Sequence, residues 1–189
     1  MRARMALIRA GWEVELREVV LRDRPAHMLA VSPKGTVPVL LLADGTIIDE
    51  SLDIMRQALD WRPNDLQAQW IARNDGEFKF HLDRYKYSNR YEDVDASEHR
   101  QAAARYLAEL DSFLRTASSI SVSLSDALFP FVRQFANHDR EWFDTQPWPN
   151  IHAWLAVNLE SDEFGRCMKK YRPWTKADPV VTFPPARSG

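Results

Sequence analysis

The sequence predicts an α/β domain over residues 1–60 and an all-helical, bundle-like domain over residues 66–171, joined by a linker at residues 61–65. Three observations support this division. Helical and alternating apolar patterns follow one another up to residue 60, a polar stretch with a proline interrupts them, and only helical stripes follow it. Residues 172–189 contain four prolines and are expected to drape over the surface or to be disordered.

Composition and charge describe a globular protein. The chain has 189 residues, 45% of them hydrophobic and 28% charged, with a formal net charge of −2. This balance argues against nucleic acid or an anionic membrane as a partner, and no apolar run is long enough to span a bilayer. The single cysteine excludes an intramolecular disulfide and fits a reducing compartment. Met1–Trp12 contains three arginines and no acid, as transit peptides do, but it continues into the next strand pattern, so we expect a cytoplasmic protein.

The first elements follow from periodicity. Arg2–Ala10 is predicted to be a helix, and Gly11 stands where a helix end needs a left-handed residue. Glu13–Arg17 alternates as a strand with one buried face, and Val19–Leu21 extends it. Pro25–Val31 is predicted to be a short helix.

A β-hairpin follows. Two β-rich runs flank Asp44-Gly45, which is a strong hairpin signal. Pro38 lies where a strand should pair, although proline has no N–H to donate. Either Val37–Pro38 is a cis bond that leaves the backbone of Val37 free to pair with a ligand, or Pro38 is a trans residue that opens an edge strand.

Glu50-Ser51 ends the second strand and begins a helix. Ser51 is predicted to be its N-cap. The free amides at the start of the helix would hold a carboxylate, and Glu50 would hold an ammonium group, which together suit an amino-acid head group. The alternative is a capping serine beside a solvated glutamate.

These motifs resemble the glutathione-binding half of glutathione S-transferases. The resemblance rests on Ser32-Pro33-x-Gly35-x-Val37-Pro38-x-Leu40, a turn, and then Glu50-Ser51. It implies a thioredoxin-like N-terminal domain and a helical C-terminal domain. It also implies that Val37, beside Pro38, pairs its backbone with the cysteinyl unit of glutathione, and that Glu50 and Ser51 bind the γ-glutamyl end.

The order of elements departs from the family in one respect. The family's first strand, with the catalytic Cys, Ser or Tyr segment after it, has no counterpart before Met1-Arg2. That strand is central in the family's sheet, and each backbone group left unsatisfied would cost about 1–3 kcal/mol. Three explanations remain: a start at an internal methionine, a strand donated by a partner chain, or closure of the two remaining strands against each other. The catalytic residue is therefore unknown.

The second half of the chain is predicted to be helical throughout. Asn74–Gly76 is expected to cap a helix carrying His81 and Tyr85 on one face. Ser123 and Asp126 resemble the Ser-x-x-Asp cap of the central helix in the family's C-terminal domains, and Pro130 falls inside that helix.

Other candidate chemistry is weak. Cys167 lies on an apolar helical stripe, so a buried structural thiol is favoured over a nucleophile. The five histidines have no metal-ligand spacing, and no metal is expected.

Two functions are compatible with these features. The first is a glutathione S-transferase-like enzyme that takes glutathione as co-substrate and transfers its thiol to an apolar electrophile or a disulfide. The alternative is a catalytically inactive binding or interaction module on the same scaffold. Family dimers imply a homodimer, with strand donation between protomers as one arrangement.

Overall fold

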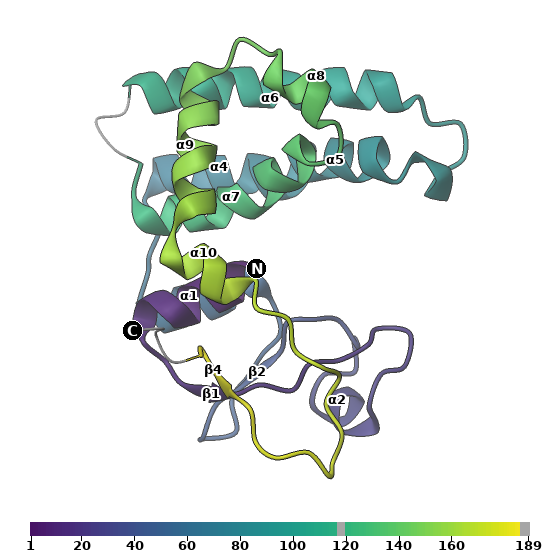
Figure 1. Ribbon diagram of the computed structural model, residues 1–189, viewed down its shortest axis with the longest axis vertical. Helices are drawn as coiled ribbons and strands as arrows, with labels where there is room; N and C mark the ends of the chain where they lie inside the picture. The colour runs from purple at the N-terminus through teal and green to yellow at the C-terminus, as the bar shows by residue number, and fades with distance from the viewer. Residues whose placement is uncertain (117–119, 186–189) are drawn as a thin grey trace. The chain divides into compact units, whose positions relative to one another are not determined.

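The structure is a computed structural model that describes residues 1–116 and 120–185 (Figure 1). It has the predicted fold class, a thioredoxin-like α/β part and a helical part. Its compact units are Met1–Arg62 together with the chain from Asp162 onward, and Pro63–Ser161. The boundaries expected from sequence at residues 61–65 and 171 remain predictions.

The α/β unit begins with the predicted order of helix, strand, helix, strand, strand and helix. Its elements are α1 (Arg2–Ala10), β1 (Val14–Glu15), α2 (Ala26–Val31), β2 (Leu40–Leu41), β3 (Ile47–Ile48), α3 (Ser51–Leu59), α10 (Asp162–Cys167) and β4 (Thr182–Phe183). The strands are shorter than the sequence predicts, because alternation reports burial whereas a strand also needs a paired neighbour.

Helix α1 is central to this unit because its apolar stripe is buried, with Met5 and Ala6 fully covered. The helix ends as predicted at Gly11, whose φ is 66°. One buried cluster contains Ala3 of α1, Leu40 of β2 and Ile54 of α3. Packing against this cluster fixes the hairpin and α3 relative to α1.

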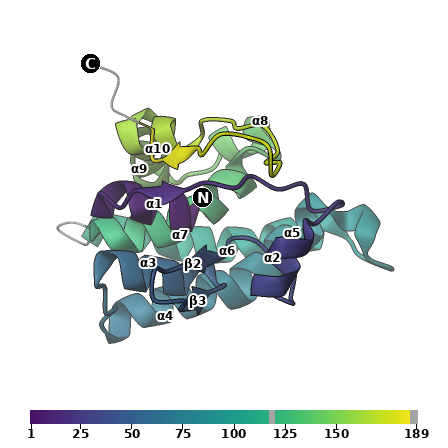
Figure 2. The ribbon, with the colours of Figure 1, turned by 90° about the horizontal axis from the view of Figure 1, so that it is seen from below.

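The strands form two separate antiparallel pairs. In the first, β1 pairs with β4, so that Val14 lies opposite Phe183, and in the second, β2 pairs with β3. Figure 2 shows β4 and the β2–β3 hairpin on opposite sides of the segment that follows α1. Of the three explanations for the missing strand, closure of β1 and β2 against each other does not occur among the described residues.

Two strand edges lack a neighbour among the described strands. Leu16 N donates to Val181 O at 2.7 Å, and Leu42 N donates to Thr46 O at 2.9 Å. Because ladder hydrogen bonds alternate along an antiparallel pair, the main chain of Glu15 points away from β4 and that of Leu41 points away from β3. These edges can pair with an added strand.

The helical unit has a core rich in aromatic residues. Its elements are α4 (Asp65–Arg73), the π-helix η1 (Asn74–Phe78), α5 (Lys79–Lys86), the 3₁₀ turn η2 (Ser88–Arg90), α6 (Ala96–Thr116), α7 (Val122–Ala136), α8 (Arg140–Asp144) and α9 (Pro149–Glu160). Phe78 is fully buried and stacks on Tyr106 with ring centroids 4.6 Å apart.

The predicted cap at Asn74–Gly76 is wrong. The backbone runs from α4 through η1 into α5 without leaving helical conformation, since both Arg73 and Phe78 have right-handed φ and ψ. Asn74 is fully buried, so its polar side chain faces the interior. The cap lies one helix earlier, where Asn64 and Gln67 form a reciprocal capping box at the start of α4.

The cap of α7 lies at Ser121, two residues before the predicted Ser123. Ser121 Oγ accepts hydrogen bonds from Leu124 N at 3.3 Å and from Gln67 Nε2 at 3.0 Å. Pro130 lies inside α7 as predicted. The Ser-x-x-Asp pattern misplaced the cap because Ser121 and Ser123 are each followed three residues later by a residue of α7, Leu124 and Asp126, so the spacing alone does not choose between them.

Ser121→Ala is expected to lower the free energy of unfolding by about 1 kcal/mol, because a first-turn amide of α7 loses its acceptor. Ser123→Ala is the matched control, with an expected change below about 0.5 kcal/mol. Urea unfolding followed by circular dichroism measures both. A larger loss of unfolding free energy in Ser123→Ala than in Ser121→Ala would show that Ser123 is the cap.

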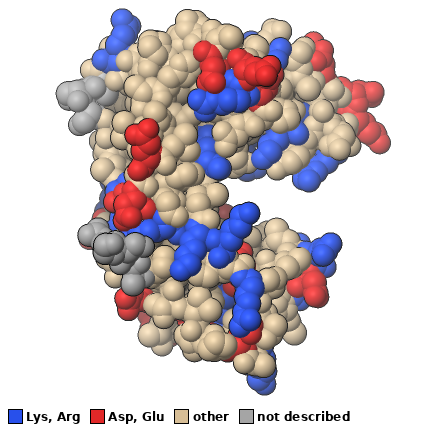
Figure 3. All heavy atoms as spheres, viewed as in Figure 1, with Lys and Arg blue, Asp and Glu red and all other residues tan. Residues whose placement is uncertain are grey.

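Charges of both signs are interspersed over the face of the helical unit that Figure 3 shows. Ion pairs such as Arg73–Glu109, with N and O 2.7 Å apart, also lie on the surface of this unit. This distribution is typical of a solvated surface. None of the described helices is long and apolar enough to cross a membrane.

Candidate functional site

The predicted glutathione contacts lie at one end of the β2–β3 hairpin. Leu40 lies opposite Ile48 in the ladder, so Pro38 and Glu50, each two residues further out, leave the hairpin at the same end. The structure thereby brings the segment before β2 close to the start of α3. Their role in binding glutathione remains a prediction.

The Val37–Pro38 peptide bond is cis, the first of the two alternatives. The Val37 side chain is 48% exposed. Among residues 1–116 and 120–185, none donates a hydrogen bond to the main chain of Val37 or accepts one from it. The protein therefore leaves one donor and one acceptor available beside Pro38.

Helix α3 begins one residue earlier than predicted. Glu50 is its N-cap, with extended φ and ψ of −118° and 135°, and Ser51 is its first residue, so the prediction of Ser51 as the cap is wrong. No side chain caps the helix, and the first amide bonded to the chain itself is Ile54 N, which donates to Glu50 O at 3.0 Å. The amides of Ser51, Leu52 and Asp53 have no acceptor among the described residues.

A cation that the sequence analysis overlooked lies beside Glu50. Lys34 Nζ is 3.1 Å from Asp49 Oδ2 and 3.5 Å from Glu50 Oε1. The Asp49 carboxylate makes the larger contribution to raising the pKa of Lys34, and the Glu50 carboxylate makes the smaller one. The sequence gives one indication of a role for Lys34, its position in the Ser-Pro-Lys-Gly turn. Lys34 therefore connects this turn to the start of α3 and partly neutralises Glu50.

The turn between α2 and Val37 depends on Gly35. Its φ is +60°, in the left-handed region, and its carbonyl accepts a hydrogen bond from Arg24 Nε at 2.7 Å. A Cβ added there would lie 2.9 Å from Arg24 Cδ and 3.1 Å from Leu29 Cδ2. The positive φ favours glycine, and the close contacts are with the side chains of Arg24 and Leu29, which can move to relieve them.

Gly35→Ala is expected to lower the free energy of unfolding by about 1–2 kcal/mol, because alanine is strained at this φ. Gly76→Ala is the matched control. Gly76 lies in helical backbone, and a Cβ added to it would meet no described atom within 4 Å. Alanine there should therefore be neutral or stabilising by up to about 1 kcal/mol. Thermal or urea unfolding of both variants tests this, and equal effects would contradict it.

Two further features of the described residues bear on nucleophilic and metal chemistry, the thiol of Cys167 and the clustering of metal-binding side chains. Cys167 is 2% exposed, which confirms the expectation of a buried thiol, although an open hollow of about 310 Å³ adjoins it beside Arg4 and Lys169. Within residues 1–116 and 120–185, no group of three or more His, Cys, Asp or Glu side chains could hold a metal ion.

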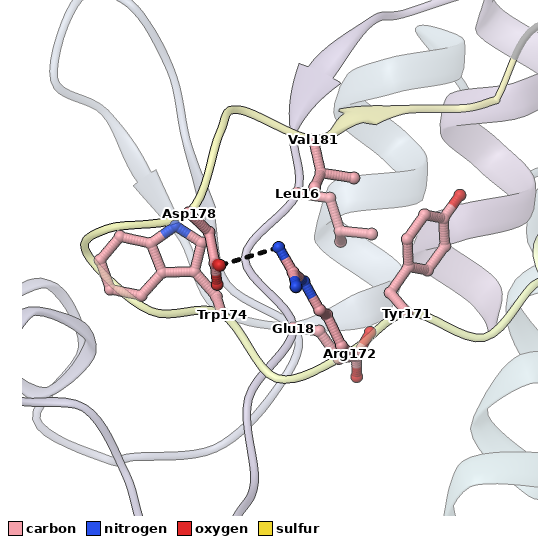
Figure 4. Close-up of a pocket in the computed structure, with 7 residues that line it drawn as sticks. All are labelled: Leu16, Glu18, Tyr171, Arg172, Trp174, Asp178 and Val181. Carbon is pink, nitrogen blue, oxygen red and sulfur yellow. Dashed lines mark hydrogen bonds and ion pairs between the residues drawn. The ribbon is translucent and has the colours of Figure 1, made fainter.

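A small cavity lies elsewhere in the α/β unit (Figure 4). It has a volume of about 50 Å³ and lies between the segment after β1 and the C-terminal segment, with Leu16, Tyr171 and Trp174 among its lining residues. Arg172 also lines it and bonds Asp178 Oδ1 at 2.9 Å. Ligand sites typically measure about 300–1,000 Å³, so this cavity has room for a few waters only.

The comparisons with known proteins agree with this arrangement. Residues 1–58 match the family model for the glutathione S-transferase N-terminal domain. No curated protein has a significant match to the chain.

Solved structures share the fold across both units. The bacterial glutathione S-transferase BphK, in a ternary complex, is 21% identical with a TM-score of 0.71 over 88% of this chain and 92% of that one. The glutathione transferase URE2P6 from Phanerochaete chrysosporium, in complex with oxidised glutathione, is 16% identical with a TM-score of 0.74 over 88% of each chain. A sphingomonad glutathione S-transferase complexed with glutathione is 18% identical, with a TM-score of 0.71 over 88% and 91%.

At these identities the solved structures show the fold alone, and the family model covers residues 1–58 only. The chain therefore has the fold of glutathione S-transferases, and its first 58 residues match the N-terminal domain of that family.

Proposed function

We propose that this protein binds glutathione at the end of the β2–β3 hairpin and transfers its thiol to an electrophile or a disulfide. The observation that carries the proposal is the unpaired main chain of Val37 beside cis Pro38. An extended peptide pairs with such a segment through its own N–H and C=O groups, as in β-augmentation. The cysteinyl unit of glutathione would lie there.

The γ-glutamyl head group would bind at the start of α3. Its carboxylate would accept hydrogen bonds from the uncapped amides of Ser51 and Leu52, where the helix dipole also favours an anion. Its ammonium group would pair with Glu50, whose side chain is 64% exposed and so accessible. Lys34 would have to move from Glu50 or share it, which makes Lys34 a modulator of affinity.

The reacting thiol has no assigned partner in this chain. In the proposed transfer, a protein group would lower the pKa of the glutathione thiol, and the glutathione thiolate would attack the electrophile and displace its leaving group, or attack the disulfide and release one of its two thiols. No described side chain is assigned to that step, so the catalytic residue stays unknown. The alternative function, a catalytically inactive binding or interaction module on the same scaffold, lacks this step.

Calorimetric titration with reduced glutathione tests the binding. We expect saturable binding of one molecule per chain, weakened at least about tenfold by Glu50→Gln, since hydrogen bonds to charged groups contribute about 1.5–3 kcal/mol. Asp53→Asn is the matched control, because Asp53 lies in the same first turn and pairs with Arg56. No binding, or equal effects of the two variants, would refute the assignment.

Turnover separates the two functions. The chain is assayed with glutathione and either an aryl halide or a mixed disulfide. Conjugation or thiol exchange above the uncatalysed rate supports the transferase. Binding without turnover supports the alternative, a catalytically inactive binding or interaction module.

The proposal extends to partners and location. We propose a homodimer in the cytoplasm, with an apolar electrophile or a disulfide as second substrate. The unpaired edges of β1 and β2 would accept a strand donated by the other protomer. Light scattering after size-exclusion chromatography measures the mass, and a monomer at all concentrations would refute the dimer.

A further inference from the structure

Two histidines form a close pair in the helical unit, outside the proposed glutathione site. His81 lies on α5 and His99 on α6, and their Nδ1 atoms are 2.7 Å apart. The ring centroids are 4.9 Å apart, with 42° between the ring planes. Phe80 packs against both rings, with centroid distances of 5.1 and 5.7 Å, and holds them in place. The pair is therefore a packed arrangement.

At 2.7 Å the two Nδ1 atoms share a hydrogen bond, so one of them carries the proton. A metal ion would bind both Nδ1 atoms after this proton has moved to Nε2 of the same ring. An imidazole that keeps its proton on Nε2 leaves Nδ1 unprotonated. Across the described chain, no residue hydrogen-bonds to Nε2 of either ring, so nothing there prevents this tautomer.

The surrounding charges are mixed. Glu77 and Asp95 lie close enough to influence His81 and His99 respectively, and Arg84 and Arg105 oppose them near His81.

We propose that His81 and His99 chelate one transition-metal ion that prefers square-planar or octahedral geometry, such as Ni²⁺ or Cu²⁺, through their Nδ1 atoms. With metal–nitrogen bonds of about 2.0–2.1 Å, the 2.7 Å separation subtends about 80–85° at the metal. That angle matches neighbouring positions of square-planar and octahedral ions and is too narrow for a tetrahedral one. Water would fill the remaining positions.

Such a site would join α5 to α6 across the loop that contains η2. A metal that binds the folded state raises its stability, because the unfolded chain does not hold the two rings together. Binding would weaken as the pH falls, since protons compete for the same lone pairs.

The test is a calorimetric titration of the full chain with Ni²⁺ at pH 7.5, with Zn²⁺ in parallel. We expect one Ni²⁺ per chain, at least about tenfold weaker binding in His81→Gln and in His99→Gln, and a Ni²⁺-dependent rise in Tm that both variants lose. His138→Gln is the matched control, because His138 lies in the same unit and packs on Tyr85 without joining the pair.

Three results would overturn the proposal: no saturable Ni²⁺ binding, Ni²⁺ binding retained in both variants, or Zn²⁺ binding more tightly than Ni²⁺. Circular dichroism at the temperature of the titration verifies folding. If a glutamine variant is unfolded, the asparagine variant at the same position replaces it in the comparison.

Discussion

Asp111→Ala is expected to lower the free energy of unfolding by about 3–5 kcal/mol, enough to unfold a marginal domain. Asp111 is 8% exposed on α6 and holds the start of α9. Its Oδ1 accepts hydrogen bonds from Asn150 N and Ile151 N, and its Oδ2 accepts one from Asn150 Nδ2, all at 2.9 Å. Pro149 has no amide, so Asp111 serves the first two amides of α9.

Alanine would leave those amides without an acceptor, whereas Asp111→Asn would keep one oxygen and lose the charge. The asparagine variant should therefore fall between the wild type and alanine. Asp144→Ala is the control, because Asp144 forms an exposed pair with Arg140 worth at most about 1 kcal/mol. Urea unfolding measures all three, and an Asp111→Ala loss below that of Asp144→Ala would contradict the account.

Ser51→Pro is expected to weaken glutathione binding at least about tenfold while leaving stability unchanged within about 0.5 kcal/mol. Ser51 is the first residue of α3, where proline is well tolerated. Glu50 already has the extended backbone that a following proline demands. The substitution therefore removes one amide from the proposed carboxylate site without breaking the helix.

Ser51→Ala is the matched control, because it removes the hydroxyl and keeps the amide. The difference in glutathione affinity between the two variants, measured by calorimetry, isolates the N–H group. Equal affinities would show that the amide of residue 51 does not bind the ligand. An unfolded proline variant would contradict the helix boundary instead.

Prediction from sequence succeeded where the determinants are local. Residues 2–10 formed the predicted helix up to Gly11, because the apolar stripe and the left-handed glycine lie within one segment. The hairpin around Asp44-Gly45 also formed as predicted, with Gly45 at φ 89°. Both signals need no information about distant residues.

It failed where two local signals compete or where the partner is distant. Ser121 and Ser123 are both competent caps, and the side chain of Gln67, which bonds Ser121, is remote in sequence. Asn74 and Gly76 are typical of helix ends, yet packing of buried Asn74 and Phe78 carries the helix through them. Local propensity is weak against tertiary burial.

The candidate site also contains one part that could be predicted from sequence and one part that could not. The motif around Pro38 and Glu50 could be predicted from the chain alone, since its residues are close in sequence and carry their own turn chemistry. The ion pairs of Lys34 with Asp49 and Glu50 could not be predicted in this way, because they depend on how the fold places the turn that contains Lys34 beside the start of α3.

By itself the sequence determined the order of elements in the α/β part, the hairpin and the family resemblance, since periodicity and turn residues act over a few positions. Only the tertiary structure decided that β1 pairs with β4 from the far end of the chain, that the main chain of Val37 is unpaired among the described residues, and that His81 meets His99. The physical reason is that pairing between distant segments depends on burial and backbone hydrogen bonding summed over the whole chain, which no single segment encodes.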